Sequence, residues 1–248
     1  LNDALAAYGE RGVVETINRA QFVHVDGVYR MSELPPYPKR EAYSTGMQFL
    51  DPHYRVRMGD FAVVTGIPGY GKTTFVNDLC CRLAKQHGWT VAWASFEQHP
   101  QADHRRALRN WYLGVPSTNA EEIARADKWI DEHFSFIVPS DEELASLDWL
   151  LETAAASVIR HGARVVVVDP WNEIDHVRDN RISQTEYVGM AIKELKRFAR
   201  KFDVHLVVVA HPAKMAGGEE PSLYSISDSA HWANKCDVGL VIHRDSPD

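Results

Sequence analysis

One short stretch constrains the fold of this 248-residue chain more than any other feature. Residues 66–73 read Gly-Ile-Pro-Gly-Tyr-Gly-Lys-Thr and match the pattern G-x-x-x-x-G-K-S/T in full. The apolar segment 61–65 precedes this stretch, and the segment 72–87 carries apolar residues at helical spacing. In that context the glycines let backbone N–H groups turn inward around phosphate oxygens, and the N-terminus of the helix adds a favourable field. The sequence therefore predicts a phosphate-binding loop between a strand and a helix.

The residues of this loop take distinct predicted roles. Lys72 supplies a mobile positive charge for the β- and γ-phosphates of a nucleotide, and the Thr73 hydroxyl is a predicted Mg²⁺ ligand. ATP, or another NTP or dNTP, together with Mg²⁺ is therefore the expected cofactor. The predicted nucleotide-contacting residues are Gly66, Pro68, Gly69, Tyr70, Gly71, Lys72, Thr73 and Thr74.

Two carboxylates follow apolar segments elsewhere in the chain. Asp169 ends the valine run 165–168, a position from which a carboxylate can hold Mg²⁺ through water. Pro170 follows it, so the common Asp-Glu pair is absent. Hydrolysis also needs a group that orients the attacking water, and we assign that role to Glu97, which ends the segment 92–96. This assignment expects that segment to be a strand next to the one before the phosphate loop.

A histidine occupies a third position of this kind. His211 follows the apolar segment 206–210 and precedes Pro212. A polar group at such a strand end can touch the γ-phosphate and report its loss to the following loop. We therefore predict that His211 belongs to the catalytic group together with Lys72 and Glu97.

Strand and helix candidates alternate along most of the chain. Alternation of this kind predicts an α/β fold with βαβ units and a mostly parallel sheet covered by helices on both faces. Ligands in such folds bind at the carboxyl ends of the strands. The predicted strands are 61–65, 90–96, 134–138, 164–169, 204–210 and 238–243, and the predicted helices are 72–87, 101–113, 119–132, 143–160 and 184–202.

The first 42 residues form a separate predicted region. A helix is expected over 1–20 with a break at Gly9, followed by an extended stretch at 22–25. Three prolines within 31–45 indicate a linker. The predicted organisation is thus a short helical linker region over 1–42 and an ATPase domain over 43–248.

Composition limits the setting in which the chain works. The net charge of −7 argues against a broad basic surface, but it allows nucleic acid to be held by a few local cations. Three cysteines, two of them adjacent, provide neither a disulfide framework nor a zinc-binding spacing. The expected location is therefore the cytoplasm. No apolar run approaches the roughly 20 residues that span a bilayer, so no membrane partner is expected.

A set of short segments, taken in order, resembles one family. The set is Tyr43 to Gly46, Gly66 to Thr74, Ser95 to Glu97, Val168-Asp169, Ala210 to Pro212, and Ser227 to Asp237 followed by Val241 to Arg244. Together they resemble the RecA-like motor of the DnaB-type replicative helicases, above all the primase-helicase branch of bacteriophages and the mitochondrial Twinkle helicase. That branch carries His where the bacterial DnaB proteins carry Gln, and His211 occupies that place.

The resemblance implies a RecA-like P-loop NTPase core that assembles into a ring, usually a hexamer. Such a ring hydrolyses NTP with Mg²⁺, translocates on single-stranded DNA and unwinds the duplex. Its linker helix packs on the neighbouring subunit, and a primase domain or protein is a further candidate partner. In the family the Glu after the second strand activates water, which agrees with the role assigned to Glu97.

The resemblance also indicates where the DNA contacts and the arginine finger are expected. The loops 172–185 and 213–224 are expected to face the DNA, with Arg178, Arg181 and Lys214 as candidate phosphate contacts. The family's arginine finger follows the last predicted strand, so we expect it beyond Asp248, with the C-terminal end of the domain truncated. A chain without that group is expected to bind nucleotide but to hydrolyse it slowly.

Three other functions use the same kind of loop. A recombinase or a KaiC-like ATPase shares the core and the placement of the Glu. A P-loop phosphotransferase needs an acceptor pocket with its own base and an arginine-containing lid, and no compact lid of that kind is evident. A non-hydrolysing assembly module needs no complete catalytic set, whereas Lys72, Thr73, Glu97 and Asp169 together form one.

Overall fold

The structure, a computed structural model, describes residues 2–20, 25–37, 39–140, 142–177, 181–214, 219–228 and 230–244. The chain divides into two compact units, Leu1–Lys39 and Arg40–Asp248. In the first unit, α1 (Asn2–Arg19) is interrupted at Gly9, whose φ of 66° and ψ of −168° are not helical. The predicted break at this glycine is confirmed. The predicted extended stretch at 22–25 falls almost entirely outside the described residues.

A parallel sheet forms the centre of the second unit. Within the described residues it has six strands in the order β3-β2-β4-β5-β1-β6, and each strand pair is parallel. The predicted parallel sheet is therefore confirmed, with strand ends that differ by a few residues. The strands are β1 (Phe61–Thr65), β2 (Thr90–Ser95), β3 (Phe134–Ile137), β4 (Ala163–Asp169), β5 (His205–Val209) and β6 (Val238–Val241).

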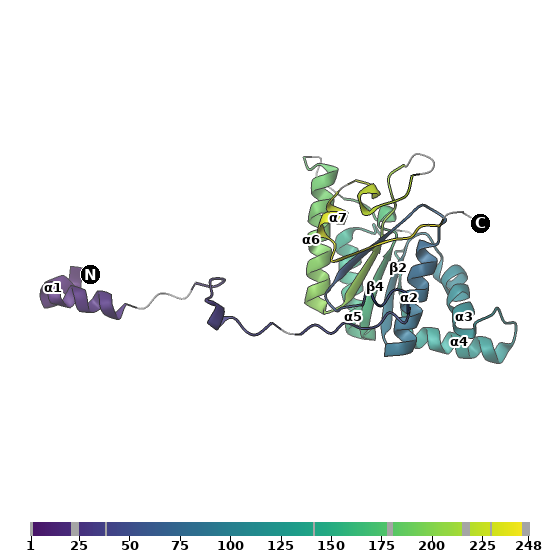
Figure 1. Cartoon of the computed structure of the whole chain (residues 1–248), viewed down its shortest axis with the longest axis horizontal. Coiled ribbons are helices and arrows are strands. Elements are labelled where there is room, and N and C mark those ends of the chain that lie inside the picture. The colour runs from purple at the N-terminus through teal and green to yellow at the C-terminus, as the bar shows by residue number, and fades with distance from the viewer. Residues whose placement is uncertain are drawn as a thin grey trace. The chain divides into compact units, whose positions relative to one another are not determined.

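Helices cover both faces of this sheet (Figure 1). The valines of β4 show why the strands are apolar throughout. Val165 and Val167 pack in one core cluster, whereas Val166 and Val168 pack in the other, because alternate side chains of a strand point to opposite faces. One face carries α2 (Lys72–His87), α3 (Arg105–Leu113) and α4 (Ala120–His133), and the other carries α5 (Leu147–His161), α6 (Gln184–Phe202) and α7 (His231–Lys235).

The helix ends follow local sequence signals. The Ser183 side chain accepts a hydrogen bond from the backbone N–H of Glu186 and so caps the start of α6. Gly88 ends α2 in the left-handed conformation, as predicted. The predicted helix over 101–113 is α-helical only from Arg105, because Pro100–His104 form a π-helix. In the parts of the chain that the structure describes, every helix is too short or too polar to cross a membrane.

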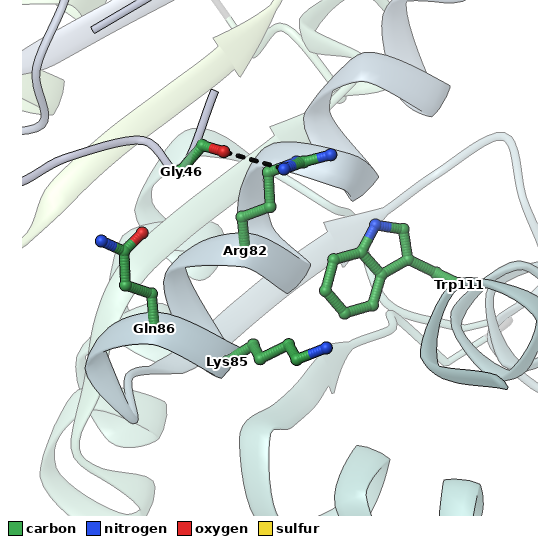
Figure 2. A pocket seen from close by; sticks show the side chains of 5 residues that line it. All are labelled: Gly46, Arg82, Lys85, Gln86 and Trp111. Carbon is green, nitrogen blue, oxygen red and sulfur yellow. Dashed lines mark hydrogen bonds between the residues drawn. The ribbon is translucent and has the colours of Figure 1, made fainter. Parts of the chain in front are cut away.

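The segment before β1 is fixed to the last turns of α2 (Figure 2). The Arg82 guanidinium donates a hydrogen bond of 2.8 Å to the carbonyl oxygen of Gly46. A pocket of about 540 Å³ lies here, and its lining is completed by Lys85 and Gln86 of α2 and by Trp111 of α3. The phosphate loop precedes the first turn of the same helix, roughly 20 Å away at 1.5 Å per residue. This pocket is therefore separate from the phosphate site.

Candidate functional site

The predicted site residues meet at one edge of the sheet. The carboxyl ends of parallel strands share an edge. The phosphate loop follows β1, Glu97 follows β2, Asp169 ends β4 and His211 follows β5. A cleft of about 280 Å³ opens at this edge, lined by Pro68, Gly69, Gly71, Lys72, Thr73, Thr74, Glu97, Gln98 and His211. The structure thus brings most of the predicted residues together and adds Gln98.

Two predicted loop residues contribute in another way. Gly66 is buried, and a Cβ at this position would collide with the carbonyl oxygen of Ile242, so only glycine lets β1 and the segment after β6 approach this closely. Tyr70 stacks on His243 with ring centroids 6.0 Å apart. It lines an adjacent pocket of about 590 Å³ that also includes Arg244. Neither Gly66 nor Tyr70 is among the residues lining the cleft.

Lys72 is buried at the bottom of the loop. Its ammonium group donates hydrogen bonds to the carbonyl oxygens of Gly66 at 2.9 Å and Ile67 at 3.3 Å. Burial lowers the pKa of Lys72, and the nearby carboxylates of Asp169 and Glu97 oppose that fall. Lys72 thus lines the cleft near two carboxylates, where its positive charge can meet a phosphate group.

Asp169 and Thr73 place two oxygen ligands side by side. Asp169 is buried, and burial raises the pKa of its carboxyl group to about 6, against the hydrogen bond from the Thr73 side chain. A hydroxyl and a carboxylate are ligands that suit Mg²⁺, which keeps several waters and phosphate oxygens as its other ligands. Among the described residues no group of three His, Cys, Asp or Glu side chains could hold a metal ion. The Thr73 hydroxyl and the Asp169 carboxylate are a donor pair that fits Mg²⁺ with water and phosphate oxygens as its other ligands.

His211 faces Glu97 across the cleft. Its Nε2 atom lies 3.7 Å from Oε1 of Glu97. Burial lowers the pKa of His211, as does the charge of Lys72, while the Glu97 carboxylate opposes the change. The backbone N–H of His211 donates a hydrogen bond of 2.8 Å to the Asn172 side chain, just after β4. Asn172 was not predicted, because a single Asn in a polar stretch carries no recognisable pattern.

The expectation that β2 neighbours β1 is wrong. β4 and β5 lie between these two strands. Glu97 reaches the cleft by another route: Ser95 is paired in register with Asp169, and the backbone N–H of Phe96 donates to the carbonyl oxygen of Asp169 at 3.0 Å. Pairing with β4, and not with β1, thus places Glu97 at the cleft.

The structure describes two of the three candidate DNA contacts. Arg178 lies outside the described residues. Arg181 and Lys214 are exposed, and neither lines the cleft. Their role in binding DNA stays a prediction.

Comparison with known proteins identifies relatives of this arrangement. Residues 52–217 match the family described as an AAA domain. The chain is 35% identical to the Twinkle homolog protein, chloroplastic/mitochondrial, of Arabidopsis thaliana, over 98% of this chain and 37% of that protein. It is 27% identical to the DNA helicase/primase of Enterobacteria phage T3, over 69% of this chain and 32% of that protein. The chain therefore spans about a third of the length of these two relatives.

A solved structure shares the fold. The structure of a DnaB-like replicative helicase, described with its interactions with primase, superposes with a TM-score of 0.68 at 17% identity, over 98% of this chain and 61% of that chain. The second unit thus has the RecA-like fold expected from the sequence. With the match to residues 52–217, the chain belongs to the AAA domain family, and its similarity to the Twinkle homolog agrees with the resemblance to DnaB-type helicase motor domains of the primase-helicase branch.

Proposed function

We propose that this chain hydrolyses a nucleoside triphosphate with Mg²⁺ and uses the energy to move a replicative helicase along single-stranded DNA. The observation that carries the proposal is the meeting of Lys72, Thr73, Glu97 and Asp169 at the carboxyl edge of one parallel sheet. A loop that only bound phosphate would need neither carboxylate.

Nucleotide binding follows from the charges and dipoles around the loop. Backbone N–H groups of the phosphate loop and the N-terminus of α2 would face the phosphates, and Lys72 would neutralise their β- and γ-oxygens. Thr73 and Asp169 would hold Mg²⁺. The ion would neutralise the negative charge that develops on the phosphates. Tyr70 lines the adjacent pocket and stacks on His243, so the rest of a nucleotide could extend toward this side of the loop.

Hydrolysis requires a base at the γ-phosphate end of the cleft. The Glu97 carboxylate accepts a proton from water as the water oxygen bonds to the γ-phosphorus, and the bond from that phosphorus to the bridging oxygen breaks. The Glu97 side chain is 45% exposed and opens into the cleft, so water can reach it. His211 lies beside Glu97, and its backbone is tied to Asn172. A change at the γ-phosphate can thus pass to the segments after β4 and β5.

Coupling to DNA and ring assembly complete the proposal. The loops 172–185 and 213–224 follow β4 and β5, so movements at His211 would reach the candidate contacts Arg178, Arg181 and Lys214. The first unit supports self-association, because α1 exposes large apolar side chains that a neighbouring subunit could cover. These side chains are Leu5, Tyr8, Val14 and Ile17.

A ring, expected to be a hexamer, would also bring an arginine from the next subunit to each nucleotide. A primase domain or protein is the further proposed partner.

The test is NTP hydrolysis with and without single-stranded DNA, with Lys72→Ala as the inactive variant. Lys85→Ala, on the same helix but in the pocket of Figure 2, is the matched control. Hydrolysis that DNA stimulates and that only Lys72→Ala abolishes supports the motor. Hydrolysis indifferent to DNA would favour another RecA-like ATPase, and transfer of phosphate to a small acceptor would favour a phosphotransferase.

A further inference from the structure

A buried row of hydrogen bonds lies behind the turn that carries Glu97. The Ser95 hydroxyl is 2.6 Å from the carbonyl oxygen of Gln98 and 2.9 Å from Nε2 of His104. Ser95 and His104 are both buried, and His104 has no exposed surface. Neither residue touches the cleft, so the nucleotide site does not explain why these polar groups are there.

The direction of these hydrogen bonds is fixed by chemistry. The carbonyl oxygen of Gln98 can only accept, so the Ser95 hydroxyl donates its one hydrogen to it. Ser95 Oγ then accepts from His104, which places the proton of the neutral ring on Nε2. Nδ1 of His104 is buried and has no hydrogen-bond partner among the described residues. Burial lowers the pKa of His104 to about 4, so the ring stays neutral and keeps this tautomer at neutral pH.

Packing and backbone geometry hold the His104 ring in place. Its centroid lies 4.8 Å from that of Trp93 and 5.3 Å from that of Phe136. His104 is the last residue of the π-helix Pro100–His104, which begins directly after the turn that carries Glu97. Short π-helical turns of this kind are frequent at functional sites.

The turn itself is held from two sides. The backbone N–H of Phe96 is bonded to the Asp169 carbonyl, and the carbonyl of Gln98 is bonded to Ser95. Glu97 lies between these two fixed points, while its side chain opens into the cleft. A catalytic group gives its full effect only when neighbouring hydrogen bonds hold it in the productive geometry.

We propose that His104 is a positioning residue for Glu97. Its Nε2–H group orients the Ser95 hydroxyl onto the Gln98 carbonyl and so fixes the turn that directs the Glu97 carboxylate into the cleft. The inference rests on the proposed function of Glu97 in hydrolysis. It adds two residues, His104 and Ser95, that contact neither nucleotide nor water at the reacting centre.

The test compares two buried histidines. His104→Phe keeps an aromatic ring between Trp93 and Phe136 but removes the Nε2–H donor. His205→Phe is the matched control, because His205 is equally buried and bonds to Tyr54 at 2.7 Å, at the amino end of β5. His104→Phe is expected to lower kcat about 10- to 100-fold with KM and nucleotide affinity unchanged, whereas His205→Phe keeps the wild-type kcat.

Two further measurements separate positioning from general damage. His104→Gln returns an amide N–H near the position of Nε2 and should restore part of the kcat. In hydrogen–deuterium exchange, the backbone amides of residues 96–98 should exchange faster in His104→Phe but not in His205→Phe. If His104→Phe fails to fold, Ser95→Ala removes the same hydrogen bonds from the other end and is expected to show the same loss of kcat and protection.

The outcomes distinguish this inference from the function on which it rests. Wild-type kcat and wild-type exchange at residues 96–98 in a folded His104→Phe or Ser95→Ala variant overturn the inference. An equal loss of kcat in His205→Phe overturns it too, because the effect would then be general. If Glu97→Gln hydrolyses NTP at the wild-type rate, the proposed function of Glu97 fails instead, and faster exchange at 96–98 in His104→Phe still supports the fixed turn.

Discussion

The Nε2 atom of His211 and the Oε1 atom of Glu97 lie 3.7 Å apart, although the two residues follow strands that β4 separates. Because burial lowers the pKa of His211, a neutral imidazole faces a carboxylate at neutral pH. The contact joins the residue proposed to activate water to the residue proposed to report the γ-phosphate. If these proposed roles hold, the loss of the γ-phosphate would act directly on the residue that begins the loop after β5.

Glu97→Gln should separate hydrolysis from nucleotide binding. The amide cannot accept a proton from water, so the hydrolysis rate is expected to fall at least about 100-fold, whereas nucleotide affinity stays near the wild-type value. Steady-state phosphate release and the binding of a fluorescent nucleotide measure the two effects. Glu173→Gln is the control, since Glu173 is an exposed carboxylate near His211 that does not line the cleft. A Glu97→Gln chain that hydrolyses NTP at the wild-type rate would remove Glu97 from the mechanism.

Gly66→Ala tests the close approach of β1 and the segment after β6. A Cβ at this position collides with the Ile242 carbonyl, which is backbone and cannot swing aside. We expect a loss of more than about 3 kcal/mol in the free energy of unfolding, or failure to fold. The matched control is Gly162→Ala, where φ is 66° and a Cβ meets open space, with an expected cost of about 1–2 kcal/mol. Equal costs in a urea titration would contradict the packing described at the loop.

The stability of the second unit should fall in mild acid. Burial lowers the pKa of His205 to about 4, so between pH 6.5 and 4 the unfolded chain binds a proton that the folded chain does not. The stability that this histidine contributes is present above pH 6.5 and is lost as the pH falls, by about 2 kcal/mol between pH 7 and pH 5. His205→Phe is therefore expected to be less stable at pH 7 but to lose less stability on acidification than the wild type. The free energy of unfolding of both proteins is measured at pH 7 and pH 5. An equal loss in the wild type and in His205→Phe would show that His205 is not buried in its neutral form.

Ile17→Asp should weaken self-association without destabilising the second unit. Ile17 is exposed on α1, so a charge there costs little within its own subunit. If α1 packs on a neighbouring subunit, the charge must be buried at that contact, and the assembly is expected to dissociate in sedimentation velocity. Ile159→Asp, on the exposed face of α5, serves as the control. Unchanged sedimentation of the Ile17→Asp chain would argue against the linker helix as an interface.

The elements that could be predicted are those with strong local signals. The four-valine run of β4 is apolar on both faces, and the phosphate loop has a fixed spacing of Gly, Lys and Thr, so both could be placed to within a residue or two. α7 (His231–Lys235) was missed because five residues are too few to show a helical period. Strand order depends on contacts between distant segments, which is why the neighbour assigned to β2 was wrong.

Within the site, too, residues with a local sequence signal could be predicted, whereas residues placed by contacts between distant segments could not. Lys72, Asp169 and Glu97 each end or follow a recognisable element, so their meeting at one edge follows from the rule for parallel sheets. Asn172 and His104 contribute through hydrogen bonds to particular backbone groups, at 2.8 Å to the His211 N–H and through Ser95 to the Gln98 carbonyl. Contacts of this kind depend on the folded backbone and leave no periodic signal in the sequence.

The most direct test of the motor is the affinity for single-stranded DNA in different nucleotide states. Fluorescence anisotropy with a labelled oligonucleotide would compare Mg²⁺ plus a non-hydrolysable ATP analogue with Mg²⁺ plus ADP, for the wild type and for Lys72→Ala. A motor must couple the two sites, so the account predicts affinities that differ about tenfold or more in the wild type and not at all in Lys72→Ala. Equal DNA affinity in both nucleotide states of the wild-type chain would contradict the proposal that hydrolysis at this cleft drives movement on DNA.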